Sequence, residues 1–229
     1  MKPQEILLNS PLKKLIDEEI NDEHVGSSVD TPMRPDAFDV SDEKKIEIIA
    51  KHFKTIMETL GLDLKDDSLK GTPMRVAKMY VQEVFSGLNP DNKPSATLFE
   101  NKFKYDEMIV EKDITFYSHC EHHFVPIYGK AHVAYISTGR VIGLSKMNRI
   151  VQYYSKRPQV QERLTMQIGK ELMEILDTEH VAVAMDANHL CVSSRGVGDV
   201  NSKTGTAFFS GKFKEDITKS EFLNYINTK

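Results

Sequence analysis

The sequence is short of several features that define large classes of protein. It has no tryptophan and only two cysteines among 229 residues, and no run approaches the roughly 18 consecutive apolar residues of a membrane-spanning helix. Its start, MKPQEILLNSPLKK, has no long apolar stretch behind the basic residues, so it does not resemble an export signal. These absences exclude a disulfide-stapled scaffold and predict a cytoplasmic protein with no membrane partner.

The sequence also lacks an excess of positive charge. Lysine and arginine together number 30 against 34 acidic residues, which gives a net charge of -4. A nucleic-acid partner held by overall charge is therefore not expected, although a local basic pocket could still bind a smaller polyanion. The hydrophobic content of 40% and the charged content of 28% are ordinary for a soluble globular protein.

The N-terminal half is polar at first and then helical. Residues 1–40 show no sustained period and are interpreted as an extended or partly disordered arm. Ser41 is a suitable N-cap for an amphipathic helix that stops at Gly61. A second helix is predicted from Thr72, with Pro73 in its first turn, to Gly87. We therefore assign residues 41–100 to a helical N-terminal part.

The remaining residues, 101–229, mix strand and helix patterns. Residues 104–117 and 127–137 have the composition of neighbouring strands, and two further strands are predicted in HVAVAMDANHLCVSSRGV and GTAFFSGKF. Helices are predicted in LSKMNRIVQYYS and, at helical apolar spacing, in RPQVQERLTMQIGKELMEIL. The predicted class is α+β with an antiparallel sheet.

The segment SHCEHHFVP places one cysteine and three histidines within a few positions, between the first two predicted strands. Cys120 and His123 form a C-x-x-H pair that one loop can turn toward a single ion. In a strand, His189 and Cys191 would be i and i+2 on one face, and would point into the same pocket. Cys120, His123 and Cys191 would form a set of two thiolates and one imidazole, which suits zinc. Three protein ligands leave the fourth position of a catalytic zinc site open.

Two histidines remain beside this ligand set. His122 and His189 are then available as proton carriers, because imidazole titrates near neutral pH. A closed structural zinc site, a disulfide or unrelated thiols are the simpler alternatives. His119 is assigned to a loop or surface position.

Three cations form a second group. Lys146 and Arg149 share one face of a predicted helix that Gly143 and Ser145 could begin, and Arg195 follows Cys191 by four residues. A helix start with cations invites phosphate, and three cations on an acidic protein suit a polyphosphate. Solvated surface charges are the alternative for Lys146 and Arg149 taken alone.

Gln161 and Glu162 begin the long predicted helix. An ionised carboxylate has only acceptors, so Glu162 could take the adjacent N1–H and exocyclic amine of guanine, a donor pair that adenine lacks. Taken alone, Glu162 is more simply a favourable charge at a helix N-terminus.

Taken together, SHCEHHFVP, GLSKMNRIVQYYSKRPQVQERLT and HLCVSSRGVGD resemble the GTP cyclohydrolase I family, and the resemblance extends over about residues 40–229, including TPMRVAKMY. It implies the T-fold, in which an antiparallel sheet has helices packed on one side, and a homo-oligomer, commonly a decamer of two pentamers with sites at subunit interfaces. It implies zinc-dependent conversion of GTP and water to 7,8-dihydroneopterin triphosphate and formate.

The resemblance also implies a role for each matched residue. The zinc ligands fall on Cys120, His123 and Cys191, and the acid/base histidines on His122 and His189. Guanine recognition falls on Gln161 and Glu162, and the triphosphate contacts on Ser145, Lys146, Arg149 and Arg195, with Arg75 and Lys78 as further candidates. Two rivals remain: a non-catalytic nucleotide-binding protein with structural zinc, and a T-fold deazapurine reductase, which would use a nucleophilic thiol and nicotinamide and has no need of CEHH.

Overall fold

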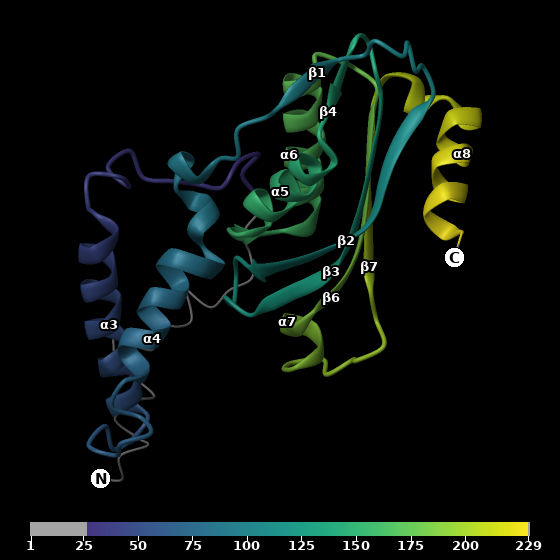
Figure 1. Cartoon of the computed structure of the whole chain (residues 1–229). Coiled ribbons are helices and arrows are strands. Elements are labelled where there is room, and N and C mark those ends of the chain that lie inside the picture. Colours follow the sequence, from purple (N-terminus) through teal and green to yellow (C-terminus); the bar gives the residue numbers. More distant parts are fainter. Residues whose placement is uncertain (1–26, 229) are drawn as a thin grey trace.

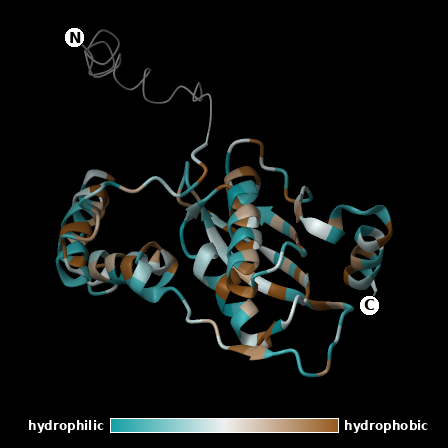
Figure 2. Ribbon diagram, turned by 90° about the horizontal axis from the view of Figure 1, so that it is seen from above, coloured by the Kyte–Doolittle hydropathy of each residue, from teal (hydrophilic) through white to brown (hydrophobic). Residues whose placement is uncertain are grey.

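The computed structural model describes residues 27–228, so most of the predicted arm lies outside the described residues. Two regions are evident in Figure 1: helices α3 and α4 stand to one side, and a sheet with its own helices forms the rest. Figure 2, seen from above, shows the same two regions lying side by side. No helix within the described range is long and apolar enough to cross a membrane.

Both predicted helices are present in the helical region. Helix α3 spans Asp42–Thr59, and the Ser41 hydroxyl accepts a hydrogen bond from the Lys44 backbone N–H, as expected for an N-cap. Gly61 follows at φ 83°, a left-handed conformation that ends the helix at low cost. Helix α4 spans Thr72–Lys78 and continues as a π-helix, Met79–Val84, and a 3-10 turn, Ser86–Leu88.

The sheet has five strands in the order β5-β2-β3-β6-β7. Their bounds are Pro158–Gln159 for β5, Met108–Cys120 for β2, Pro126–Ile136 for β3, Val181–His189 for β6 and Thr204–Phe209 for β7. All neighbours are antiparallel except β5 and β2. A small separate pair joins β1, Leu98–Glu100, to β4, Arg140–Ile142. The predicted antiparallel α+β fold is confirmed.

The main core lies between one sheet face and two helices, α5 (Leu144–Ser155) and α6 (Gln161–Leu176). Alternate strand positions such as Phe116, Val133 and Met185 meet Ile150 and Ile168 there. Each such side chain contributes about 1.5 to 3 kcal/mol by leaving water. This is the helix layer expected for the T-fold.

The opposite sheet face carries a smaller cluster. Ala134 and Ala182, whose side chains point away from the main core, pack with Phe213 and with Phe222 of α8, which spans Asp216–Asn227. Figure 1 shows α8 on the far side of the sheet from α5 and α6. This second cluster covers only one end of that face, because Tyr117 and Tyr128 further along it are exposed. The candidate functional residues lie at that other end, where β2 and β6 end.

Candidate active site

The C-E-H-H segment forms a tight loop between β2 and β3. Cys120 ends β2, and its backbone N–H and C=O bond to Val125 and Phe124 at 2.9 and 2.8 Å. Phe124 adopts φ 54°, which turns the chain back toward β3. We call residues 120–125 the metal loop. Its short closure holds the two histidines of the loop beside the cysteine that precedes them.

Three ligand atoms converge at this loop. The ligand atoms of Cys120, His123 and Cys191 all lie within 4.8 Å of one another, and Cys120 Sγ is 3.9 Å from His123 Nδ1. Both cysteines are free thiols. Ligand atoms around a tetrahedral zinc are about 3.3 to 3.8 Å apart, so a small contraction would close the set on one ion.

The chemistry of the donors also fits a cation. Burial raises the pKa of the Cys191 thiol, and the neighbouring Cys120 raises it further. Two thiolates side by side need a positive charge between them. Two sulfurs and an imidazole, without a carboxylate, form a donor set that zinc prefers.

The local structure around Cys191 corrects one prediction. Strand β6 ends at His189, and Cys191 belongs to a short helix, α7, Leu190–Ser193, so the predicted i, i+2 strand pair is wrong. The hydroxyls of Ser193 and Ser194 donate to the carbonyls of His189 and Leu190. Short serine side chains thus support a helical turn here instead of a continued strand. Cys191 still reaches the loop because β6 lies beside β3.

His119 corrects a second prediction. It is a β2 residue, 9% exposed, and not a loop or surface residue. Its ring packs edge-on against Phe85 with centroids 5.3 Å apart. Burial lowers the pKa of His119, and its buried Nδ1 has no hydrogen-bond partner within the described residues. His119 thus joins the metal-loop strand to the helical region.

Of the two predicted proton carriers, His122 contacts the ligand set, and His189 precedes the ligand Cys191 by two residues. His122 Nδ1 is 3.7 Å from Cys120 Sγ, and His122 Nε2 is 3.7 Å from Glu121 Oε1. His189 Nε2 is 2.7 Å from Gln161 Oε1. Burial lowers the pKa of His189, while the charge of Glu162 partly opposes this.

The first turn of α6 supplies neighbours for both histidines. Gln161 is 2% exposed and contacts His189, whereas Glu162 is exposed. Arg163 is buried and forms a bidentate ion pair with Glu121 at 2.6 and 3.2 Å. Its Nε also donates to the Ser28 carbonyl at 2.8 Å. Our sequence reasoning did not identify Arg163 or Glu121.

The three predicted cations separate into two places. Arg195 Nη1 lies 2.8 Å from His123 Nε2, at the metal loop. Helix α5, which carries Ser145, Lys146 and Arg149, begins beside the opposite end of β2, where the Asn148 amide donates to Glu111 at 3.0 Å. Glu111 and Cys120 are about 30 Å apart along the strand at 3.3 Å per residue. Within one chain, the first half of α5, which carries these three residues, and the metal loop are therefore not brought together, whereas the end of the helix leads to β5 beside Cys120.

The two remaining candidate cations also lie elsewhere. Arg75 and Lys78 are exposed on α4 in the helical region. One guanidinium nitrogen of Arg75 donates to the Ser68 carbonyl and to the Thr72 hydroxyl, which stabilises the turn before α4. Within residues 27–228, neither side chain forms a hydrogen bond or ion pair with the metal loop.

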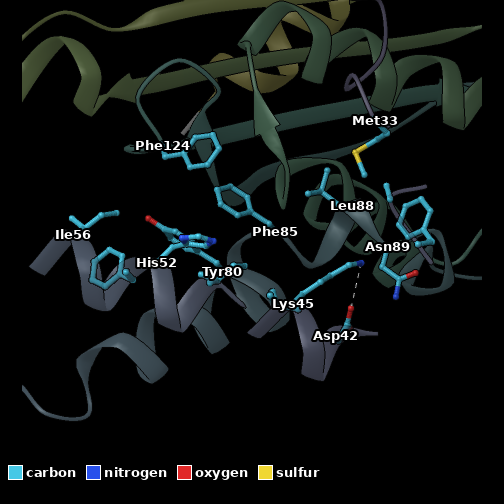
Figure 3. Close-up of a pocket in the computed structure, with 15 residues that line it drawn as sticks. Met33, Asp42, Lys45, His52, Ile56, Tyr80, Phe85, Leu88, Asn89 and Phe124 are labelled. Atoms are coloured by element: carbon cyan, nitrogen blue, oxygen red, sulfur yellow. Dashed lines mark ion pairs between the residues drawn. The ribbon is translucent and has the colours of Figure 1, made fainter. Parts of the chain in front are cut away.

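A mostly apolar pocket separates the metal loop from α3. Its volume is about 430 Å³, and Figure 3 shows Phe124 of the loop and Phe85 above Tyr80 and His52. Phe85 is 5.1 Å from Phe124 and 5.2 Å from Tyr80, measured between ring centroids. Its lining contains neither the three ligand residues nor His122 and His189, so the pocket is distinct from the candidate active site.

Comparison with known families identifies the chain. The family model for GTP cyclohydrolase I matches residues 49–227, which include the metal loop, α5, α6 and α7. The chain belongs to the GTP cyclohydrolase I family. This confirms the resemblance inferred from the sequence motifs.

Curated relatives agree with the family assignment. The chain is 63% identical to GTP cyclohydrolase 1 of Flavobacterium johnsoniae over 209 residues, covering 91% of this chain and 94% of that protein. It is 51% identical to GTP cyclohydrolase 1 of Salmonella arizonae over 208 residues, with 90% and 94% coverage. Among solved structures, an archaeosine synthase QueF-like protein in its apo form matches 47% of this chain and 97% of its own. Its TM-score is 0.40, at 17% identity.

Proposed function

We propose that this chain hydrolyses GTP to 7,8-dihydroneopterin triphosphate and formate, the first step of folate and pterin biosynthesis. Family membership over residues 49–227 supports the activity. The observation that carries the proposal for this particular chain is the convergence of Cys120, His123 and Cys191 within 4.8 Å. Two further histidines accompany them: His122 contacts Cys120, and His189 precedes Cys191 by two residues. A purely structural metal site would have no use for those histidines.

The metal proposed for this site is zinc, held by Cys120, His123 and Cys191. When bound, it would supply Lewis acidity and lower the pKa of a water molecule to about 7, which makes that water a nucleophile near neutral pH. Glu121 and Arg163 hold the loop that carries two of these ligands. Arg195, at 2.8 Å from His123, lies close enough to pair with an anionic group of the substrate.

The other side chains would bind and orient GTP and carry its protons. His122 and His189 would transfer protons to and from the ring nitrogen and the ribose oxygen, each contributing about 10² to 10⁴ in rate. Glu162 would accept hydrogen bonds from N1–H and the exocyclic amine of guanine. The resemblance also gives Gln161 a part in guanine recognition. Ser145, Lys146, Arg149 and Arg195 would hold the triphosphate.

The separation of α5 from the metal loop supports an oligomeric enzyme. If Lys146 and Arg149 bind the phosphates of a GTP whose base lies at the metal loop, they must come from a second copy of the chain. Both outer strands of the sheet could also pair with another copy, because β7 has one neighbour and β2 meets β5 only at His119 and Cys120. We propose a homo-oligomer, a decamer of two pentamers as the family resemblance implies.

The activity is tested by incubating purified protein with GTP and measuring both formate and the fluorescent oxidised pterin. Turnover should disappear with a chelator and return with added zinc. Stoichiometric GTP binding without either product would instead favour the non-catalytic nucleotide-binding protein.

The shared site is tested separately by mixing two inactive variants. Cys191→Ser lacks a ligand at the metal loop, and Arg149→Ala lacks a phosphate contact on α5. If sites form between copies, co-assembled oligomers should regain part of the activity, because some sites combine two intact halves. No recovery in verified mixed oligomers would place both groups in one chain's site.

A further inference from the structure

We propose that Gln161 is a positioning residue that holds the His189 ring in one tautomer, with the proton on Nε2 and the lone pair on Nδ1. The inference rests on the proposed function in one respect, namely that His189 acts as a proton carrier. It assigns to Gln161 a role that differs from guanine recognition.

The orientation of the Gln161 amide follows from its partners. Its nitrogen lies 3.2 Å from the Met185 carbonyl, 2.9 Å from the Thr204 carbonyl and 3.1 Å from the Thr206 hydroxyl. A carbonyl can only accept, so the atom facing two of them must be the NH₂ group. The reversed amide would place three acceptor oxygens together in a site that is 2% exposed.

The amide orientation in turn decides the state of the histidine. With NH₂ turned toward the strands, the atom that faces His189 Nε2 at 2.7 Å is the Gln161 oxygen. An amide oxygen only accepts, so Nε2 must carry a hydrogen and donate. In the neutral ring the other nitrogen, Nδ1, then has the lone pair, and no hydrogen bond engages it within residues 27–228. Nδ1 is therefore the nitrogen that can accept a proton.

The surrounding packing keeps Gln161 in place. It is the first residue of α6, and its backbone carbonyl accepts from the Thr165 hydroxyl at 2.8 Å. That hydroxyl is also 2.7 Å from the hydroxyl of Thr206 on β7. The turn is thus bound to both β6, through Met185, and β7, through Thr204 and Thr206. A second group that fixes tautomer and ring orientation is the usual way in which proteins set the chemistry of a histidine.

This engagement leaves the Gln161 amide with no spare donor for a ligand. Its two N–H groups are shared among three acceptors, and its oxygen is taken by His189. A direct guanine contact would have to break one of these buried bonds. The adjacent Glu162 is exposed, and no hydrogen bond engages its carboxylate among residues 27–228.

The test uses zinc-loaded, full-length protein labelled with ¹⁵N-histidine. The His189 resonances are assigned by their loss in His189→Ala. Wild type should show a protonated Nε2 and an unprotonated Nδ1 above the titration range of the ring, and Gln161→Leu should lose this preference. With GTP, Gln161→Leu should lower kcat at least about tenfold while KM changes less than about twofold.

The wild-type spectrum and a control variant keep the test informative. The wild-type His189 resonances decide the tautomer by themselves, even if Gln161→Leu fails to fold. Thr206→Val removes one acceptor of the amide but leaves both carbonyls, so tautomer and kcat should stay as in wild type. A proton on Nδ1 in wild type overturns the proposal. A rise in KM for GTP with kcat unchanged in Gln161→Leu would also overturn it, in favour of a guanine contact.

The spectroscopic result does not depend on turnover. If the wild type did not convert GTP, the proposed function would fail, while the tautomer assignment would still be decided by the resonances of His189.

Discussion

Arg163 and Glu121 form a buried bidentate ion pair directly beneath the metal loop. The side chain of Arg163 is 3% exposed and that of Glu121 is 19% exposed, with N–O distances of 2.6 and 3.2 Å. Glu121 lies between the ligand Cys120 and the proton carrier His122, and Arg163 follows Glu162 on α6. The pair therefore connects the helix turn proposed to bind guanine with the loop proposed to bind zinc.

Removal of Arg163 should destabilise both the fold and the metal site. In Arg163→Met the Glu121 carboxylate loses its buried partner, so the free energy of unfolding should fall by about 3 kcal/mol. Zinc affinity should fall about 10- to 100-fold, as for other groups that support a ligand loop. Chemical denaturation and competition with a zinc chelator measure the two effects.

A matched control is available in an exposed ion pair. Lys44 and Glu47 are 2.9 Å apart but more than 60% exposed, so Lys44→Met should change stability by less than about 0.5 kcal/mol and leave zinc affinity unaltered. Equal effects of the Arg163 and Lys44 substitutions would show that the buried pair has no special role.

The ligand and proton-carrier roles predict opposite metal contents. Cys191→Ser should lose both zinc and turnover, because it removes one of three ligands. His122→Ala and His189→Ala should retain one zinc per chain yet turn over at least about a hundredfold more slowly. Metal analysis alongside steady-state kinetics distinguishes the two classes. Zinc loss from either histidine variant would make that residue a ligand and favour a closed structural site.

The stability of the sheet should depend on pH through His132. This buried β3 residue accepts a hydrogen bond on Nδ1 from the Asp113 N–H at 3.2 Å, where β2 is irregular and Asp113 has φ 60°. Burial lowers the pKa of His132 below its ordinary value of 6.5; Asp113 and Asp186 oppose this, and Lys112 and Lys130 add to it.

Because the folded-state pKa is depressed, the unfolded chain binds the proton more readily. The contribution of His132 to stability is therefore complete above about pH 6.5 and is lost as the pH falls toward the folded-state pKa. His132→Asn, which keeps an acceptor but cannot titrate, should lose less stability than wild type between pH 7 and pH 5. Denaturation at each pH measures the difference, and His52→Asn, whose side chain is exposed at the pocket beside α3, is the control. Parallel pH curves for wild type and His132→Asn would contradict the assignment.

Local patterns were sufficient for most of the fold. The N-cap at Ser41, the apolar period of α6 and the alternation along β2 and β3 each depend on neighbours in the sequence, and the structure has all of them. The π-helical turn at Met79–Val84 and the end of β6 at His189 were not anticipated. The end of β6 depends on the hydrogen bonds of Ser193 and Ser194, which override strand propensity.

The site was predictable where its chemistry is unusual and unpredictable where it is ordinary. Cysteine and histidine are rare here, so the spacing of Cys120, His123 and Cys191 stood out. In the sequence, Arg163 is indistinguishable from other charged residues on a helix. Only the folded chain shows that it is buried in an ion pair with Glu121. The distance between α5 and the metal loop is likewise a property of the sheet, which no motif encodes.

Glu162 lies in the first turn of α6, where two explanations of its carboxylate lead to different measurements. If it only complements the helix N-terminus, Glu162→Gln should cost at most about 1 kcal/mol of stability and leave GTP kinetics nearly intact. If it accepts from N1–H and the exocyclic amine, the substitution turns one acceptor into a donor that faces a donor. We expect the second outcome, a loss of about 2 kcal/mol or more in kcat/KM, roughly thirtyfold, with unchanged zinc content and thermal stability.

The choice of substrate and control makes this result specific to guanine. Inosine triphosphate lacks the exocyclic amine, so wild type should discriminate against it more strongly than Glu162→Gln does. Glu174 is another exposed acid on α6, in the last turn of the helix, and Glu174→Gln should keep wild-type kinetics with both nucleotides. Equal GTP kinetics in wild type and Glu162→Gln would remove Glu162 from the site. The zinc assignment would stand, because its ligands lie on the metal loop and α7, and the search for the guanine contact would move to backbone groups at the start of α6.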